Sequence, residues 1–422
     1  MDVKNEARVY EKTSNKKLYF IILYILFALD FISRVGINSI FPVIQKDMNL
    51  KDWQIGMLGG IVLLGMAIFV LPISFWGEKK STRKAITLSA IVWGIGSLFS
   101  GAASGFGSLG ISRFFVGIGN SAFAPLATST ITSWYKKSQW GKTLGIFNTA
   151  MVVGSAIGAI LFAKISSTVG WRIPFYIIGV ISIIFSAVSL IIPDSIKDKQ
   201  IDGSIKEKEN NELSAKGAIK SILKNKVLIS MCIGAGIDIM ALNGLNTWTS
   251  IYFVREIGLS VSEAATLVSI MAVLSIVGFP VGGFLLDKFY EKDKRSRMWI
   301  PAICIALCGI LYFIGFYFKL IPIIIIAAMI YTFGGTAFHT TSQEIVPSHL
   351  KSVSYATYVL FIQFLGAIGP VITGFISEYF GLNNAILIIQ LLFIISAIIL
   401  FTTSFSYKKY YQKAREEESL IN

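Results

Sequence analysis

RIPFYIIGVISIIFSAVSLIIP, residues 172–193, is followed directly by the charged stretch DSIKDKQIDGSIKEKENNELSAKGAIKSILKN, residues 194–225. At 1.5 Å per helical residue, the first stretch is long enough to cross about 30 Å of hydrocarbon. The second has mixed charge and no long apolar run, which is typical of a solvated linker. Another apolar block begins at residue 226. This alternation predicts a membrane protein that is divided in two at residues 194–225.

Apolar blocks of similar length continue in both directions from this boundary, and only 15% of the chain is charged, against about 25% in soluble domains. The blocks do not alternate with period two, so they are predicted to be helices and not barrel strands. The sequence predicts an all-α membrane protein with twelve transmembrane helices in two six-helix bundles. The expected helices cover residues 18–42, 54–77, 84–105, 108–133, 143–165, 172–193, 226–253, 262–286, 299–318, 321–345, 353–377 and 383–404.

The domain organisation follows from these blocks. We expect a first bundle at residues 1–193, a cytoplasmic linker at 194–225, a second bundle at 226–404 and a cytoplasmic tail at 405–422. With the N-terminus placed inside, thirty Lys and Arg residues fall on the cytoplasmic side, six fall outside and two lie within helices. This positive-inside bias predicts a multi-pass protein of the cytoplasmic membrane with both termini cytoplasmic.

The net charge of +14 is therefore explained by topology, and no nucleic-acid partner is expected. The sequence contains no P-loop, no HExxH and no Ser-His-Asp set, so an enzyme is not expected. The three cysteines lie inside apolar blocks without zinc spacing, so neither a metal nor a cofactor is predicted. The expected partners of this monomer are a small-molecule substrate, a coupling ion and membrane lipids.

Two corresponding positions in the halves carry the same pattern. Residues 70–80 and residues 278–289 each contain a proline six or seven residues before an acid–Lys pair, and a basic cluster follows each. Such a repeat indicates internal duplication, which is common among transporters that bind solute near the middle of the membrane.

The first of these loops, SFWGEKKSTRK at residues 74–84, resembles the G-x-x-x-D-R-x-G-x-R-[RK] motif of the major facilitator superfamily, although Glu78 replaces the Asp. The second loop keeps the Gly and the Asp-Lys pair at residues 283–288, and Arg113, Gly117 and Gly119 match the family's R-x-x-x-G-x-G motif. The resemblance implies two bundles that rock about a central site, with helices 1, 4, 7 and 10 lining the cavity.

Further segments are similar to the anion:cation symporter and spinster-like families: residues 113–125, 170–172, 343–347 and 366–370. Both families usually have an Asp-Arg pair in helix 1 and often an acid after the second glycine of helix 4. Here Ser33 precedes Arg34, and Asn120 takes the second position.

Polar residues are rare in the predicted helices, so each is a candidate for binding. On helix 1, Asp30, Arg34 and Asn38 form one stripe. Arg34 is interpreted as the ligand of a substrate carboxylate with Asp30 as counter-ion or proton carrier; a purely structural ion pair is the alternative. On helix 4, Arg113 is either an anion clamp or the structural partner of Asp30.

In the second half, Asp238 is the candidate proton carrier, with a hydrogen-bonded structural acid as the alternative, and His339 could carry a proton or simply pack. The predicted binding residues are Asp30, Arg34, Asn38, Arg113, Asn120, Asn148, Asp238, Asn246, Trp248, Thr336, His339 and Gln343. The predicted gating residues are Glu78, Arg83, Asp287, Lys288 and Arg295.

Together these features favour a secondary active transporter of a small organic anion, coupled to H⁺ or Na⁺ and working by alternating access. One alternative is an exporter or flippase of an amphiphile, and a second is a membrane sensor that transports nothing.

The topology can be tested with reporter tags. A tag at position 205 and a tag at the C-terminus should both be cytoplasmic, because most loop Lys and Arg residues lie on that side. Protease protection in sealed vesicles would measure this, and an external tag at either position would contradict the helix count.

Overall fold

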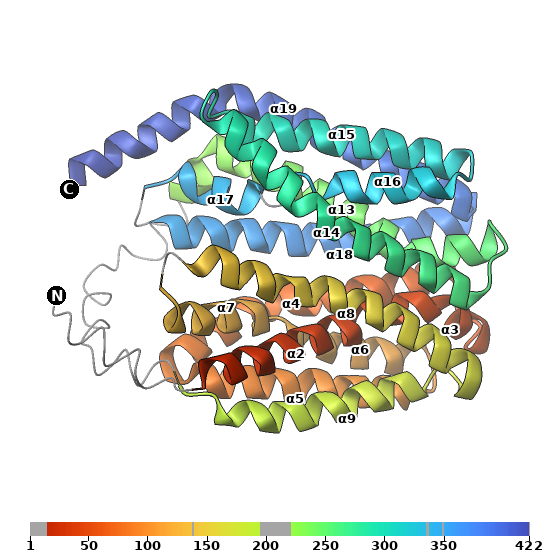
Figure 1. Ribbon diagram of the computed structural model, residues 1–422. Coiled ribbons are helices and arrows are strands. Elements are labelled where there is room, and N and C mark those ends of the chain that lie inside the picture. Colours follow the sequence, from red (N-terminus) through yellow and green to blue (C-terminus); the bar gives the residue numbers. More distant parts are fainter. Residues whose placement is uncertain (1–14, 137–138, 195–220, 335–336, 348–349, 422) are drawn as a thin grey trace. The chain divides into compact units, whose positions relative to one another are not determined.

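The computed structural model describes residues 15–136, 139–194, 221–334, 337–347 and 350–421, and its regular structure in these ranges is entirely helical (Figure 1). The chain splits into two compact units. The first unit comprises Met1–Ile40 and Leu64–Glu212, and the second comprises Phe41–Leu63 and Leu213–Asn422. Each unit is described by itself below.

Helical elements follow one another through the described residues up to Val188. They are α2 (Lys16–Val35), the 3₁₀ turn η1 (Gly36–Ile40), α3 (Phe41–Asp47), α4 (Asp52–Lys80), α5 (Thr82–Gly101), α6 (Phe106–Asn120), α7 (Phe123–Trp134), α8 (Trp140–Val169) and α9 (Ile173–Val188). A further 3₁₀ turn, η3 (Ser189–Ile191), ends this series. The boundary between the units falls inside α4, so α3 and residues 52–63 belong to the second unit.

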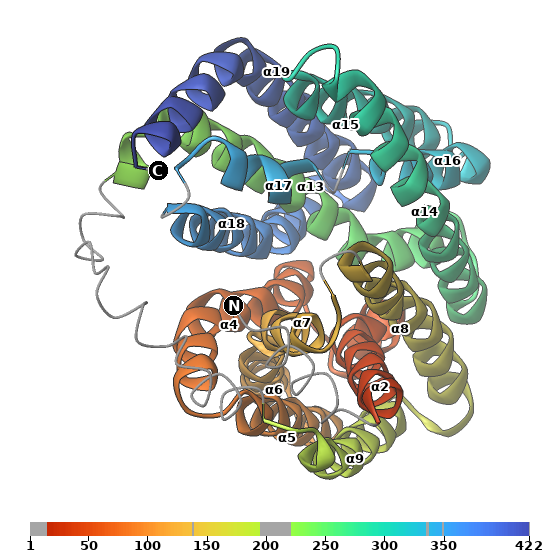
Figure 2. The ribbon, with the colours of Figure 1, turned by 60° about the vertical axis from the view of Figure 1, so that its left-hand side comes forward.

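From Lys226 on, the described part of the chain is again built from helices. They are α13 (Lys226–Arg255), α14 (Val261–Tyr290), α15 (Ser296–Tyr317), α16 (Ile321–Tyr331), α17 (Ala337–Glu344), α18 (Lys351–Phe380) and α19 (Leu382–Ile421). Within the second unit α13 packs against both α18 and α19 (Figure 2). α19 continues as one helix to Ile421 and so includes residues 405–421 of the expected cytoplasmic tail.

Eleven helical stretches of the described chain are long and apolar enough to cross a membrane. The tenth expected span, residues 321–345, is divided into α16 and α17, which are separate pieces in Figure 1. Two other spans have milder interruptions, at η1 in the first span and between α6 and α7 in the fourth. Irregular backbone at membrane depth requires protein or water partners, so these three places are where polar chemistry is expected.

Local sequence explains where many helices begin. Ser81 accepts a hydrogen bond from the Lys84 backbone N–H and caps α5, and Asn225 caps α13 in the same way through Leu228. Ser260 and Glu263 form a reciprocal capping box at the start of α14. These side chains occupy donors that the first turn of a helix leaves without a partner.

Aromatic packing fills the core of the first unit. Phe27 of α2 stacks on Phe147 of α8 with ring centroids 4.7 Å apart, and Trp93 of α5 meets Phe123 of α7 edge to face at 5.3 Å. Phe147, Trp93 and Phe123 are all 1% exposed or less. Because helices in a bilayer gain little from the hydrophobic effect between them, close packing of this kind is a main source of their association.

Glycine permits a close helix contact in this core. A Cβ atom at Gly119 of α6 would lie 2.4 Å from the backbone nitrogen of Trp93, whereas one at Gly107 of the same helix would meet nothing within 4 Å.

We therefore expect Gly119→Ala to destabilise the protein by about 1–3 kcal/mol, the usual cost of overpacking. Gly107→Ala is the matched control and should have no such cost. Thermal unfolding of the purified variants in detergent measures both, and equal stability of the two variants would show that α5 and α6 can separate freely.

Candidate functional site

A buried arginine donates hydrogen bonds at the interruption of the first membrane span. Arg113 of α6 is 0% exposed, and it donates hydrogen bonds to the backbone oxygens of Ser33 and Arg34, each at 2.9 Å. These oxygens lie where α2 gives way to η1, at a change of helical geometry. A carbonyl without a partner in this apolar setting would cost about 1–3 kcal/mol. Arg113 thus holds the end of α2 in place.

This geometry corrects two expected pairings. Arg113 does not pair with Asp30 in the described structure, because its two terminal nitrogens bind backbone oxygens. Asp30 is 2% exposed, and its Oδ1 has no hydrogen-bond partner among the residues described. Arg34 exerts an electrostatic influence on Asp30, but the ion pairs within 4.0 Å in the described ranges do not include these two side chains.

Arg34 is held by neutral groups. Its Nη1 donates to the sulfur of Met66 at 3.2 Å, and its guanidinium carbon lies 4.1 Å from the centre of the Phe31 ring. The side chain is only partly buried. In the described part of the chain, the fork of this guanidinium therefore has no carboxylate within salt-bridge distance, although it lies on a membrane-spanning helix.

The remaining predicted residues of the first unit differ in their surroundings. Asn120 ends α6 at the break before α7, and both polar atoms of its buried side chain have no hydrogen-bond partner among the described residues. Asn38 is half-buried in η1, whereas Asn148 is exposed on α8. Of the predicted gating residues, Glu78 is exposed at the end of α4, and Arg83 donates to the Leu190 oxygen at 3.3 Å.

In the second unit, Asp238 of α13 faces the interrupted span. Tyr331, the last residue of α16, donates its hydroxyl proton to Asp238 Oδ2 at 2.8 Å. Asp238 is 4% exposed, and its Oδ1 is a buried oxygen without a hydrogen-bond partner in the described structure. Sequence reasoning missed Tyr331. The available signal was its position three residues before two glycines, Gly334 and Gly335, in an otherwise apolar block.

His339 lies on the other side of this break, on α17. Its ring is exposed and meets Tyr358 of α18 edge to face, with ring centroids 5.2 Å apart. Gln343 donates to the His339 backbone oxygen at 3.3 Å. Thr336, also predicted for the site, lies outside the described residues.

The two other predicted residues of the second unit lie on α13. Trp248 is 0% exposed, and its indole N–H donates to the Pro370 oxygen of α18 at 3.1 Å, so it joins two helices. Asn246 is exposed. The structure therefore assigns Trp248 to helix packing and leaves Asn246 on an accessible face.

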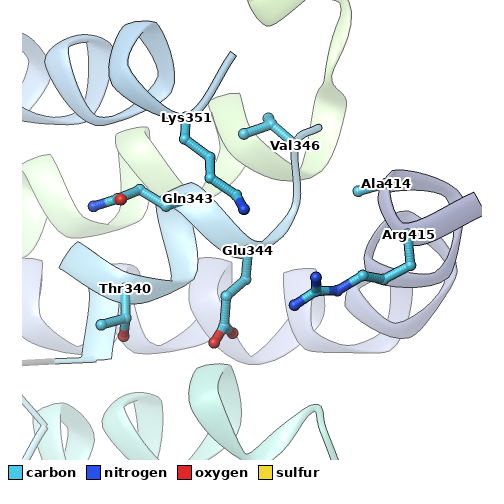
Figure 3. Close-up of a pocket in the computed structure, with 7 residues that line it drawn as sticks. All are labelled: Thr340, Gln343, Glu344, Val346, Lys351, Ala414 and Arg415. Atoms are coloured by element: carbon cyan, nitrogen blue, oxygen red, sulfur yellow. The ribbon is translucent and has the colours of Figure 1, made fainter. Parts of the chain in front are cut away.

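A polar cluster ties three helices at one end of the second unit. Glu344 of α17 pairs with Arg297 of α15 at 3.3 Å and accepts a hydrogen bond from Tyr407 of α19 at 2.8 Å. A cavity of about 250 Å³ opens beside Glu344, and Figure 3 shows Lys351 and Arg415 at its rim. The cavity is lined by Thr340, Gln343, Glu344, Val346, Lys351, Ala414 and Arg415. Gln343 is its one predicted site residue.

The predicted gating residues of the second copy lie at the end of α14 and just beyond it. Asp287 and Lys288 are exposed, while Arg295 pairs with Asp293 at 3.0 Å. The hydrogen bond from Arg295 lowers the pKa of Asp293 below its ordinary value, and the carboxylate raises the pKa of Arg295. Arg295 is therefore engaged with a neighbour that sequence reasoning did not select.

A second ion cluster was also missed. Arg255, at the end of α13, binds both oxygens of Asp52 at 2.8 and 3.0 Å, and Ser377 of α18 donates to the same carboxylate. Gln45 of α3 contacts both members of the pair. The cluster joins the α3–α4 connection to α13 and α18 within the second unit. The sequence counted Arg255 only as a loop charge, because its partner is about two hundred residues away in the chain.

Comparison with known proteins now identifies the family. The Major Facilitator Superfamily profile matches residues 23–370. The chain belongs to this superfamily. Membership confirms the predicted fold class and the expectation that this multi-pass membrane protein is a transporter and not an enzyme.

Individual transporters are also similar to this chain over most of its length. The transporter is 24% identical over 386 residues to a hexuronate transporter of Bacillus subtilis, covering 87% of this chain and 90% of that one. It is 21% identical over 419 residues to a probable galactarate/D-glucarate transporter of Escherichia coli, covering 90% and 92%. Among solved structures, an inward-facing, unoccupied bacterial homolog of the lysosomal transporter Spinster superposes with a TM-score of 0.80 at 21% identity, covering 94% and 98%.

The two arginines of the first unit should behave differently when replaced. Arg113→Met removes the donors that hold the Ser33 and Arg34 carbonyls, so it should lower the melting temperature and the yield of folded transporter; each unpaired carbonyl costs about 1–3 kcal/mol. Arg34→Met removes no backbone partner and should fold normally. Thermal unfolding in detergent compares them, and equal melting temperatures would show that the carbonyls find other donors.

Proposed function

We propose that this transporter moves a small polyhydroxy organic acid, of the sugar-acid class, across the cytoplasmic membrane by alternating access. The proposal rests on the surroundings of Arg34. This arginine lies on a membrane-spanning helix, and its described neighbours include no carboxylate within salt-bridge distance. A permanent charge at this depth is expensive unless it is paired or hydrated, and an anionic substrate would supply the missing partner.

The chemistry of the guanidinium supports this role. Its planar fork can bind the two oxygens of a carboxylate at once, and Phe31 and Met66 support it without neutralising its charge. Arg113 is unsuited to the same task, since its terminal nitrogens already bind backbone oxygens. Asp30 is near enough to act on Arg34 electrostatically and would serve as its counter-ion when no substrate is bound.

The relatives favour the same class of substrate. Proteins named for hexuronate and for galactarate or D-glucarate transport match the chain over most of its length. These compounds share a carboxylate and a chain of hydroxyl groups. The superfamily resemblance adds the proposal that residues 1–193 and 226–404 act as the two rocking bundles. The loops at residues 78–84 and 287–297 would then stabilise one of the states.

The test is uptake of radiolabelled D-glucuronate by proteoliposomes that contain the purified transporter. Arg34→Lys keeps the charge and loses the fork, so the half-saturation concentration should rise about tenfold, the effect of losing one charge-assisted hydrogen bond. Arg34→Ala should abolish uptake, because it removes the charge that binds the carboxylate.

Arg172→Lys is the matched control, because Arg172 stacks on Trp171 outside the candidate site and the same chemical change there should leave uptake intact. Normal uptake by Arg34→Ala, or a preference for neutral or cationic solutes, would contradict the proposal. Protein-dependent transfer of a labelled lysolipid in its place would favour the exporter of amphiphiles.

A further inference from the structure

We propose that Asp238, with Tyr331 as its hydrogen-bond partner, is the proton-binding site through which this transporter is driven. The inference rests on the proposed function for the identity of the transported solute, but the site itself stands on the geometry of the second unit. During each cycle the Asp238 carboxylate would take one proton from water on one side of the membrane and return it to water on the other.

The first argument is the poor solvation of the carboxylate. Asp238 is 4% exposed and has a single described hydrogen-bond donor, the Tyr331 hydroxyl at 2.8 Å. Its Oδ1 is buried and has no hydrogen-bond partner within the described ranges. An ionised carboxylate with one neutral donor would cost several kcal/mol in such surroundings. Binding a proton at Oδ1 removes that cost, so the site favours the neutral acid while it is closed.

The second argument is the set of titratable groups that face Asp238. Tyr331 approaches from α16, Cys308 from α15 and Tyr358 from α18, and each interacts with Asp238 electrostatically. From α19 the neighbour is Phe393, whose ring packs against Tyr331. The described groups that act on the carboxylate are thus uncharged in their ordinary state. Asp30 differs from Asp238 in this respect, because the positive charge of Arg34 acts on it. We therefore place Asp30 with the anion site.

The third argument is the broken span. Tyr331 is the last residue of α16, where the peptide carbonyls at a helix C-terminus carry partial negative charge. Ends of discontinuous membrane helices commonly hold coupling ions, and this end delivers the Tyr331 hydroxyl directly to Asp238. A continuous helix would give Tyr331 no such terminus, so the end of α16 at Tyr331 is part of the site.

Two further side chains of the second unit would extend this site toward the surface. Tyr358, which acts electrostatically on Asp238, lies edge to face with His339, and the His339 side chain is exposed. Hydroxyl and imidazole groups can pass a proton along with the help of water. The polar sequence Asp238, Tyr358 and His339 thus leads from the buried acid to an accessible surface of the second unit.

A carbodiimide tests the site without any transported solute. Dicyclohexylcarbodiimide adds to protonated carboxyl groups in apolar surroundings and leaves a stable acylurea that mass spectrometry locates. The full-length transporter should be labelled at Asp238 at low pH and progressively less as the pH rises. The paired carboxylates Asp52 and Asp293 should remain unlabelled. Absence of the adduct from Asp238 at low pH, or labelling that does not change with pH, would overturn the proposal.

Transport assays distinguish proton coupling from solute binding. In proteoliposomes, Asp238→Asn should lose uphill accumulation of D-glucuronate driven by a pH gradient while still catalysing counterflow, which needs no net proton movement. Asp30→Asn is the matched control, another buried acid changed in the same way. It should lower counterflow and accumulation in parallel, because it alters the anion site.

The outcomes distinguish the two proposals. Accumulation by Asp238→Asn at the wild-type level, or accumulation that requires a Na⁺ gradient in place of a pH gradient, would show that Asp238 does not couple transport to protons. If the wild-type protein shows no D-glucuronate counterflow, the proposed substrate class is wrong, and the pH-dependent labelling of Asp238 still decides whether the proton site exists.

Discussion

The two hydrogen bonds from Arg113 to the carbonyls of Ser33 and Arg34 show the constraint on which this structure depends. A polar group inside a membrane-spanning helix must be given a partner, because hydrocarbon offers none. Where the first span changes from α2 to η1, a buried arginine from α6 supplies the donors. The terminal nitrogens of Arg113 are thereby occupied by backbone oxygens, which is why we propose Arg34 and not Arg113 as the ligand of the substrate.

The second unit provides partners for its polar groups in a different way. Its interrupted span ends α16 at Tyr331, whose hydroxyl satisfies one oxygen of Asp238 and leaves the other without a described hydrogen-bond partner. At the end of the unit, Glu344 contacts both Arg297 and Tyr407 through its Oε2 atom. These contacts join α17 to α15 and α19.

Membership of the superfamily does not by itself locate these groups. The helix-1 acid of the related families is replaced by Ser33, and the helix-4 acid by Asn120. Asp30 is buried one turn from Arg34 and is influenced by it, whereas Asp238 has neutral neighbours. Another titratable group would then have to carry a coupling proton, and we propose Asp238 for this role because of its burial and its single described donor.

The sequence by itself determined the class of protein and the approximate position of most spans, because the bilayer imposes a length and a composition that each span must satisfy on its own. It did not show the interruption of the span expected at residues 321–345. It also indicated Arg34 and Asp238 as candidate site residues, since charges in apolar helices are rare. Only the tertiary structure showed which groups these residues contact. Arg113 was revealed as a backbone cap, Tyr331 as the partner of Asp238, and Arg255 as the partner of Asp52. Each of these contacts joins residues roughly eighty to two hundred positions apart, and local periodicity carries no information on such pairs.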